Sequence, residues 1–542
     1  MYKISVNKSD YSDISLINTK DQSEINIANP SYFYGFYDKD IVEFENSDKP
    51  LKLLKRNKNT NIPGILELFG TYSFKPNKRG VPGYLFRPLD RRYPIFVVRS
   101  KLKRKSTQNQ IVTVEPANWD TEEKIPNGNI VRHLGNADDE NAVAQALLFC
   151  YDVFPNKSNY NLSKHEPLFN YEGRTEITCN IYSIDPEGCE DIDDAFSLEA
   201  KTLYIHISDV YSFIRANNLL DKINNITSLY LINNNVMHAI DTKLASNWCS
   251  LKKGQTRLML TLEINLENME YKFYPSYGRI SNNFSYENYP KELDNKFTLI
   301  QALFKEYLGY EKQVDDSHQF IEAMMIIYNH LFVENLKNNG KKPIYRVQEK
   351  SERKYVDESS QLNRFLNIIS SKAANYSWDD IGHDHLGISS GYSHTTSPIR
   401  RLVDLLNQEI YYGGSVLLQK FSLNDINEYN NMLKKFYRKQ DLLKLVRAIE
   451  NKDSEEVECY IYDFVDNCLQ IYIPKYGVNI SYRIIKKKME DLYEIQKDDN
   501  SLVIKKDEEK FECKLGELTK ITVYGKLNIS DLNGSLKLDL FS

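Results

Sequence analysis

Short apolar runs separated by turns mark two regions of the chain. Gly, Pro and Asn residues separate the runs, a pattern typical of strands that close into a small β-barrel. In the region 67–155 the strand-like runs are 83–86, 95–98 and 111–114. In the region 453–542 they are 457–464, 468–473, 479–484 and 518–523. The pattern predicts one small barrel in each region, with a short helix at 141–149 leading out of the first.

The middle and the beginning of the chain are patterned differently. The range 319–337 carries apolar residues in steps of 4, 3 and 4, namely Phe320, Met324, Ile327 and Leu331. This spacing places them on one helix face and predicts a buried helix. Residues 1–66 are polar, and only 32–45 alternates enough to predict one or two strands.

A dense group of acidic residues follows an apolar run that reads as a strand. Four aspartates and two glutamates lie within the ten residues from Asp185 to Asp194, and Pro186 and Gly188 turn the chain between them. Carboxylates held this close repel one another, so their pKa values rise unless a cation neutralises them. Oxygen ligands at this density suit Mg²⁺, with Mn²⁺ as the alternative ion, rather than zinc or copper. The candidate metal ligands are Asp185, Asp191, Asp193 and Asp194.

Two other interpretations of the acidic group stay open from this stretch alone. One is a solvated acidic turn. The other is a calcium loop, although Glu187 and Cys189 stand where the second and third ligands of an EF-hand loop belong.

A second stretch, GYSHTTSPIRRLVDLL at 391–406, predicts the start of a helix. Ser397 reads as its N-cap and Pro398 as its first residue. Unpaired backbone N–H groups at a helix start, together with the guanidinium of Arg400, would bind phosphate. The alternative is a capped surface helix whose arginines are merely solvated.

Together the two stretches resemble the RNB family of exoribonucleases, of the ribonuclease II and ribonuclease R type. The resemblance rests on SIDPEGCEDIDDAF at 183–196 and YSHTTSPIRRLVDL at 392–405, and is stronger to the eukaryotic branch that includes the exosome's catalytic subunit. Further similar segments occur in the family's order: YIHISDVY, LASNWCSL, RISNNFSYENY, IEAMMIIYN and IYRVQ. The resemblance covers most of residues 67–542.

The resemblance implies an α+β multidomain fold, in which an RNB-type catalytic domain is flanked by small OB-type β-barrels. We expect a remnant of a first cold-shock-like barrel at 1–66 and a second cold-shock-like barrel at 67–155. The RNB domain is expected at 166–452 and an OB-type RNA-binding barrel at 453–542. Because the chain begins with the barrel remnant, the nuclease domain at the front of the exosome subunit is absent, and exosome association is doubtful.

The resemblance also implies an activity, the hydrolysis of single-stranded RNA from its 3′ end to 5′-mononucleotides. Asp185, Asp191 and Asp194 would hold the metal, Asp193 would complete the site by positioning water, and Arg400 would stabilise the transition state. The expected RNA contacts are Tyr286, Glu322, Ser397 and Arg401. The segment 237–240 departs from the family pattern, because MHAI interrupts a run that normally ends in proline.

The barrel predicted at 67–155 also carries aromatic and basic residues in alternation. Aromatic rings that stack on bases, and cations that follow the backbone, hold single strands without reading sequence. The candidates are Tyr84, Phe86 and Arg87, followed by the basic run 99–105. Lys486 to Lys488 would lie beside the C-terminal barrel.

The composition says more about the cellular compartment of the protein than about its function. The 542 residues are 41% hydrophobic, with a net charge of −5, so single-stranded RNA would be bound through local basic patches. Seven scattered cysteines without a C-x-x-C pair indicate a reducing compartment. Neither a signal peptide nor a membrane anchor is evident. We expect a monomer in the cytoplasm, with the nucleus not excluded.

Two further function classes stay open from the sequence. One is a catalytically silent RNA-binding protein on the same scaffold. The other is a metal-dependent phosphatase acting on small phosphoesters, which would need neither barrel.

Overall fold

The structure is a computed structural model. It describes residues 1–539 except 7–10, 12, 22, 28–29, 48, 58–60, 70–72, 103–106, 118, 120–124, 154–161, 163–165, 351–360, 451, 453, 466, 485–493, 499–500, 507–508 and 529–532. Lys103 to Lys105 of the predicted basic run and Lys486 to Lys488 lie outside the described residues. The chain divides into two compact units. One comprises Met1–Phe154, Leu231–Asn234 and Met432–Ser542, and the other comprises Pro155–Tyr230 and Asn235–Asn431.

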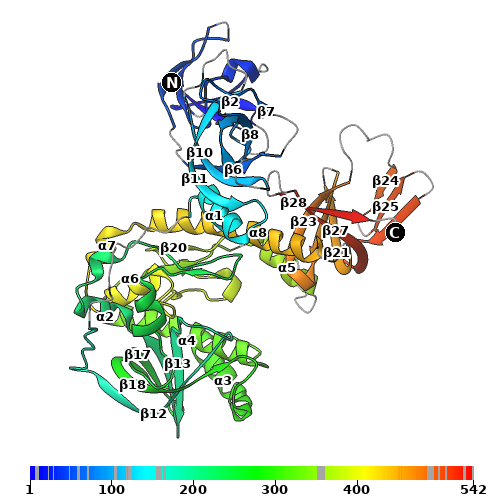
Figure 1. Ribbon diagram of the computed structural model, residues 1–542. Helices are drawn as coiled ribbons and strands as arrows, with labels where there is room; N and C mark the ends of the chain where they lie inside the picture. Colours follow the sequence, from blue (N-terminus) through cyan, green and yellow to red (C-terminus); the bar gives the residue numbers. More distant parts are fainter. Residues whose placement is uncertain are drawn as a thin grey trace. The chain divides into compact units, whose positions relative to one another are not determined.

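A closed five-stranded barrel forms the centre of the second unit (Figure 1). Its strands, in order around the barrel, are β12 (Thr175–Asp185), β13 (Asp194–Glu199), β14 (Thr202–Ser208), β17 (Thr256–Asn265) and β18 (Tyr271–Ser285). The neighbours pair antiparallel except β12 and β18, which run parallel and close the barrel. Because β12 ends at Asp185 and β13 begins at Asp194, both ends of the acidic loop are fixed by barrel strands.

Helices complete this unit and share one apolar core with the barrel. They are α2 (Val210–Ala216), α3 (Phe297–Leu308), α4 (Ser317–Asn338), α6 (Leu402–Tyr411) and α7 (Val416–Lys420). The unit also contains α5 (Gln361–Ser370), and α8 (Leu423–Glu450) follows α7. The helix predicted at 319–337 is confirmed as α4, and its four apolar residues are buried. Two small antiparallel sheets are the hairpin of β15 (Leu229–Tyr230) with β16 (Val236–Met237), and the pair β19 (Tyr345–Val347) and β20 (Asn375–Ser377).

Residues 2–55 contain more regular structure than the sequence predicted. A five-stranded sheet has the order β3-β2-β1-β4-β5, and its strands are β1 (Tyr2–Val6), β2 (Ile14–Asn18), β3 (Glu24–Asn26), β4 (Ile41–Glu43) and β5 (Lys52–Lys55). Within the stretch 32–45, where one or two strands were predicted, the structure has one strand, β4, preceded by a 3₁₀ turn at Pro30–Phe33. The sheet has its own apolar core, which includes Ile4, Leu16 and Val42.

The second N-terminal sheet confirms the predicted strands. It comprises β6 (Ile62–Leu66), β7 (Ser73–Phe74), β8 (Gly83–Pro88), β9 (Phe96–Arg99), β10 (Gln110–Pro116) and β11 (Asn127–Asn136). The additional pairing of β6 with β8 joins the sheet back on itself. Helix α1 (Glu140–Tyr151) then follows, as predicted, and is capped by the Asp139 side chain.

The C-terminal region is built from strands, as the sequence predicted. A five-stranded sheet has the order β23-β22-β21-β27-β28, and a three-stranded sheet has the order β24-β25-β26. The bounds are β21 (Glu455–Val465), β22 (Cys468–Ile473), β23 (Val478–Arg483), β24 (Glu494–Lys497), β25 (Ser501–Lys506), β26 (Glu509–Lys514), β27 (Leu518–Asn528) and β28 (Asn533–Asp539).

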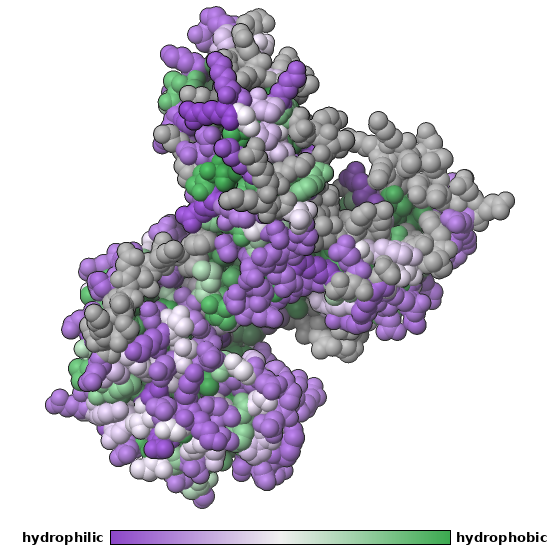
Figure 2. Space-filling model, in the orientation of Figure 1, coloured by the Kyte–Doolittle hydropathy of each residue, from purple (hydrophilic) through white to green (hydrophobic). Residues whose placement is uncertain are grey.

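The part of the barrel surface that Figure 2 shows is mostly polar. On the face shown in Figure 2, hydrophilic side chains cover most of the surface over the barrel strands and helix α3. Within the described residues, the structure holds no helix that is both long and apolar enough to cross a membrane.

Candidate active site

The acidic loop between β12 and β13 is folded against the barrel by backbone contacts. The Cys189 N–H donates to the Pro186 carbonyl at 3.1 Å, which closes a turn. Gly188 has a φ of 77° there, a conformation that favours glycine. Ser250 holds the far side of the loop, because its hydroxyl accepts from the Ile192 N–H and donates to the Glu190 carbonyl. The loop is therefore an ordered part of the barrel, which argues against the solvated acidic turn.

Asp193 joins the two sequence stretches. One of its carboxylate oxygens accepts from the Ile399 backbone N–H at 2.8 Å, and the other lies 3.4 Å from Arg400 Nε. The residue is only 4% exposed. Burial raises the Asp193 pKa well above its ordinary value, and the Arg400 charge opposes that rise. The structure thus brings together motifs that lie 206 residues apart.

Asp185 and Asp194 face each other across the start and end of the loop. Burial raises the pKa of Asp185 to about 6, and repulsion from Asp191 adds to the rise. Burial and repulsion from Asp185 raise the pKa of Asp194 to about 7. The sequence predicted like-charge repulsion, and the structure shows burial as the larger cause. Arg400 lowers both pKa values.

Asp191 has neighbours that the sequence did not single out as site residues. The Tyr230 hydroxyl donates to Asp191 Oδ2 at 3.2 Å, and the Cys189 thiol lies 3.7 Å from Oδ1. His238 Nδ1 lies 3.9 Å from Asp191 Oδ2. Tyr230 and His238 come from the β15–β16 hairpin and the residue after it. About forty residues separate them from the acidic loop, so no local spacing in the sequence could reveal the contact.

The predicted helix start at Ser397 is wrong, because α6 begins at Leu402 with Arg401 as its N-cap. Residues 397–400 form a tight turn instead, in which the Ser397 carbonyl accepts from the N–H groups of Arg400 and Arg401. Arg401 is extended (φ −131°) and pairs with Thr227, which interrupts the helix. The Ile399 N–H therefore binds the Asp193 carboxylate, rather than standing free at a helix start.

Ser397 and Arg401, predicted to contact RNA, have internal partners. The Ser397 N–H donates to Asp404 Oδ1 at 2.7 Å, and Arg401 donates to the same oxygen at 2.8 Å. The Asp404 side chain is fully buried. Both residues therefore hold the turn onto α6, and their contact with RNA stays a prediction.

Of the other two expected RNA contacts, Tyr286 and Glu322, the structure places Tyr286 at the acidic group. Its N–H donates to the Asp185 carbonyl at 3.2 Å, and its ring stacks on His318 with centroids 3.7 Å apart. Burial, followed by the charges of Asp194 and Asp185, raises its pKa to about 12. Glu322 is 55% exposed and pairs with Lys312 at 3.0 Å. The structure gives no contact between Glu322 and the aspartates.

The stacking role predicted for Tyr84 and Phe86 is wrong. Tyr84 is 5% exposed and Phe86 is fully buried, because both rings pack into the core of the second N-terminal sheet. Arg87 forms an ion pair with Glu67. The alternation of aromatic and basic residues reflects a strand with one face in the core, so neither ring is free to stack on a base.

The acidic group carries oxygen donors of the kind that a hard cation binds. Among the described residues, no three His, Cys, Asp or Glu side chains converge closely enough to hold a metal as they stand. Yet Asp185 Oδ2 is buried and has no hydrogen-bond partner in the described part of the chain, whereas Asp193 Oδ2, also without a hydrogen bond, already lies 3.4 Å from the Arg400 guanidinium. Unsatisfied buried carboxylate oxygens are costly unless a cation is near. The donor set therefore fits a hard divalent ion, once the side chains adjust around it.

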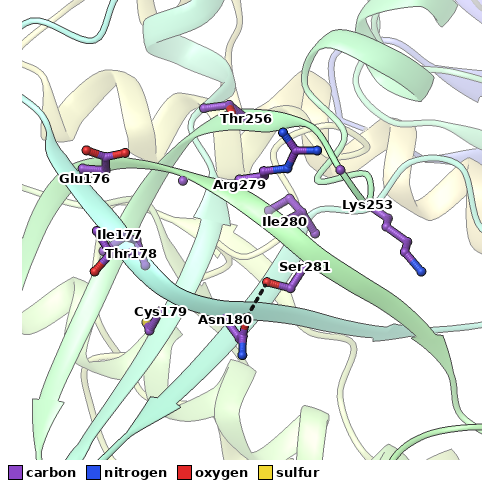
Figure 3. A pocket seen from close by; sticks show the side chains of 12 residues that line it. Glu176, Ile177, Thr178, Cys179, Asn180, Lys253, Thr256, Arg279, Ile280 and Ser281 are labelled. Atoms are coloured by element: carbon purple, nitrogen blue, oxygen red, sulfur yellow. Dashed lines mark hydrogen bonds between the residues drawn. The ribbon is translucent and has the colours of Figure 1, made fainter.

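A separate hollow lies on the barrel wall where β12 parts from β18. The two strands lose their register between Ile177 and Ile181, and the cavity there has a volume of about 550 Å³. Figure 3 shows the Ser281 hydroxyl bonded to the Asn180 amide oxygen across it, at 3.2 Å. Lys253 and Arg279 also line the cavity, and none of the four aspartates does.

Two family models match the chain inside the predicted domain ranges. The RNB domain model matches residues 174–308 and 295–413, and the model of the Dis3-like cold-shock domain 2 matches residues 83–152. The four aspartates and Arg400 lie within the residues that the RNB domain model matches. The exact domain boundaries stay predictions.

Known proteins with similar sequences or folds were also found. Ribonuclease R of Buchnera aphidicola is 25% identical over 484 residues, covering 71% of this chain and 64% of its own length. The apo form of Mycoplasma genitalium RNase R superposes with a TM-score of 0.74 at 17% identity, over 99% of this chain and 100% of that one. Yeast Ssd1, described as a pseudonuclease, superposes with a TM-score of 0.62 at 13% identity, over 100% and 96%. The two superpositions establish the fold, with its central α+β domain and barrels, and carry no information on activity.

Proposed function

Because this chain belongs to the RNB family, we propose that it is a 3′-to-5′ exoribonuclease that hydrolyses single-stranded RNA to 5′-mononucleotides with Mg²⁺. The single observation that carries the proposal is the junction at Asp193, which places the Arg400 guanidinium beside the group of buried aspartates. Mn²⁺ is the alternative ion.

Asp185, Asp191 and Asp194 would hold the ion. When bound, a hard divalent cation lowers the pKa of water and neutralises charge on a scissile phosphate. The carboxyl groups of Asp185 and Asp194 resist ionisation in the ion-free site, because burial and repulsion from neighbouring aspartates raise their pKa values to about 6 and about 7. Ion binding would reverse both effects.

Arg400 supplies a cation on the other side of the reacting phosphate. Its side chain is 43% exposed, while the Asp193 carboxylate anchors its Nε. A guanidinium anchored at one edge keeps its remaining N–H donors free for phosphate oxygens. Charge that develops in the transition state is therefore met by a group already in place. Asp193 positions Arg400 as well as completing the acidic group, a role added by the structure.

The substrate class follows from the groups around the aspartates. Tyr286 sits against Asp185, where it would contact the last nucleotide of an RNA strand. Contacts to ribose distinguish RNA from DNA through the 2′-hydroxyl. Contacts to backbone and bases would make binding tolerant of sequence and sensitive to salt.

The partner we propose is single-stranded RNA, bound by a monomer in the cytoplasm. All seven cysteines are free, which supports a reducing compartment. The chain spans only 64% of the curated relative named above, so the activity of that whole protein enters here as a proposal for this chain.

A catalytically silent RNA-binding protein is the second candidate. The fold is compatible with it, since a pseudonuclease shares the fold, and the aspartates do not converge as a metal site in this structure. The complete acidic group, in which the buried Asp185 Oδ2 has no hydrogen-bond partner among the described residues, favours the active enzyme.

A 5′-labelled single-stranded RNA incubated with the protein and Mg²⁺ tests the proposal. The proposed enzyme produces a descending ladder of shortened RNA. An unchanged band would select the silent RNA-binding protein. Loss of the 5′-terminal label alone would select a phosphatase.

A further inference from the structure

The residue after strand β16, His238, points a buried nitrogen toward the acidic group. The His238 side chain is 8% exposed and that of Asp191 is 9% exposed. His238 Nδ1 has no hydrogen-bond partner among the described residues. Leaving a buried polar nitrogen unsatisfied costs free energy, so the arrangement calls for a further group at this point.

The backbone holds His238 in place from both sides. The Ala239 N–H donates to the Ser228 hydroxyl at 2.9 Å, and the Ala239 carbonyl accepts from the Asn225 amide at 3.2 Å. Ser228 in turn donates its N–H to the Arg400 carbonyl at 2.9 Å. Ser228 therefore positions both the segment that carries the His238 imidazole and the backbone of Arg400.

Asp191 is also fixed, and its gap to His238 suits a metal ion. The Tyr230 hydroxyl holds Asp191 Oδ2 at 3.2 Å. The 3.9 Å from that oxygen to His238 Nδ1 is too long for a hydrogen bond. Metal bonds to imidazole nitrogen and carboxylate oxygen are about 2.1 Å each in zinc sites, so the two atoms lie about 3 Å apart at neighbouring octahedral positions and about 4.2 Å apart at opposite ones. The observed gap falls between these two separations, and a small movement of either side chain would let one divalent cation bond both.

We propose that His238 is a nitrogen ligand of the metal ion that Asp191 binds, and that this ligand raises the affinity of the site for Mn²⁺ relative to Mg²⁺. The proposal rests on the proposed function, because that function supplies the metal site. Imidazole suits transition-metal ions, whereas Mg²⁺ takes oxygen ligands and keeps its waters. His238 belongs to the MHAI segment that departs from the family pattern. The proposal therefore gives this segment a chemical role, the binding of a metal ion.

Pulsed electron paramagnetic resonance of Mn²⁺ bound to the full chain, without RNA, tests the ligand directly. The wild-type chain should show a ¹⁴N coupling from the coordinated imidazole, which His238→Asn should abolish. The same variant should lower Mn²⁺ affinity roughly 10-fold or more and reduce the preference for Mn²⁺ over Mg²⁺. Binding of Mn²⁺ to the wild-type chain without ¹⁴N coupling overturns the proposal, as does coupling that persists in His238→Asn.

His330→Asn is the matched control. His330 lies in the same unit, its side chain is 12% exposed, and its Nδ1 bonds the Gly391 carbonyl at 2.8 Å. This variant should keep the ¹⁴N coupling and the metal preference. RNA degradation by the wild-type chain is measured separately, in Mg²⁺ and in Mn²⁺. If the ¹⁴N coupling is present but RNA is degraded in neither metal, the exoribonuclease proposal is refuted. If RNA is degraded but no ¹⁴N coupling is seen, only the role of His238 is refuted.

Discussion

The Ile399 backbone N–H donates a 2.8 Å hydrogen bond to the Asp193 carboxylate. This bond ties the tight turn before α6 to the acidic loop of the barrel. Because Arg400 is the next residue in the turn, the same bond also fixes the position of the Arg400 backbone, from which the guanidinium side chain extends. The proposed catalytic arrangement therefore depends on a bond between a backbone N–H of one motif and a side-chain carboxylate of the other.

Arg400→Gln should reduce turnover roughly 100- to 1,000-fold, the loss seen when one preorganised transition-state donor is removed. The side chain is 43% exposed, so the free energy of unfolding should change by no more than about 1 kcal/mol. Single-turnover degradation of labelled RNA and urea unfolding check the two parts. Wild-type turnover in this variant would remove Arg400 from the chemistry.

Arg401→Met should behave in the opposite way from Arg400→Gln. Its partner Asp404 is fully buried, and removal of one member of a buried ion pair costs about 3–5 kcal/mol. Urea unfolding should show that loss of stability. If Arg401→Met unfolds like the wild-type chain but loses RNA affinity, Arg401 contacts RNA, as the sequence analysis predicted, and the structural role is wrong.

His206 should make the barrel unit sensitive to acid. Its ring bonds Ser197 and Thr261 inside the barrel, and burial lowers its pKa to about 3. The unfolded chain, with a histidine pKa near 6.5, takes up the proton first. The stabilisation is therefore complete above pH 6.5 and is lost as the pH falls from 6.5 toward 3.

Between pH 7.5 and 5.5 the loss from His206 amounts to about 1.4 kcal/mol. Urea unfolding at the two pH values measures it. His206→Asn should lack this part of the decline, whereas His318→Asn, at an exposed position, should keep it. An identical pH dependence in His206→Asn and the wild-type chain would contradict the assignment.

RNA should be shortened faster than DNA of the same length. A site that bonds the 2′-hydroxyl loses about 1–3 kcal/mol with DNA, or roughly 5- to 150-fold in rate. Glu322→Gln should reduce that ratio if Glu322 contacts the ribose. Equal rates on RNA and DNA would refute ribose recognition, and an unchanged ratio in Glu322→Gln would refute the role of Glu322 alone.

Periodicity predicted the barrels and α4 because alternation and 3.6-residue spacing are local properties. It failed at the N-terminal sheet, where short strands leave little periodic signal. Ser397 was misplaced as a helix cap for a different reason. Its sequence satisfies the capping rule, but the pairing of Arg401 with Thr227 extends the backbone there, and this long-range contact has no signal in the local sequence.

The candidate site was predicted unevenly. The four aspartates were found because density of charge is visible in sequence, and Arg400 was found because it stands in the stretch 391–406 that predicted a phosphate site. The structure brings Asp193 and Arg400 together. Tyr84 and Phe86 were misjudged because an aromatic ring on a strand can face either the core or the solvent. His238 and Tyr230 reach Asp191 only through the fold.

The most direct measurement compares the wild-type chain with Asp193→Asn on 5′-labelled single-stranded RNA, in Mg²⁺ and in Mn²⁺. Asparagine can still accept the Ile399 hydrogen bond but lacks the charge. Glu187→Gln, an exposed position in the same loop, is the control. The account predicts a descending ladder for the wild-type and control chains, and RNA binding without the ladder for Asp193→Asn, slowed at least about 100-fold. A ladder formed by Asp193→Asn at the wild-type rate would contradict the account.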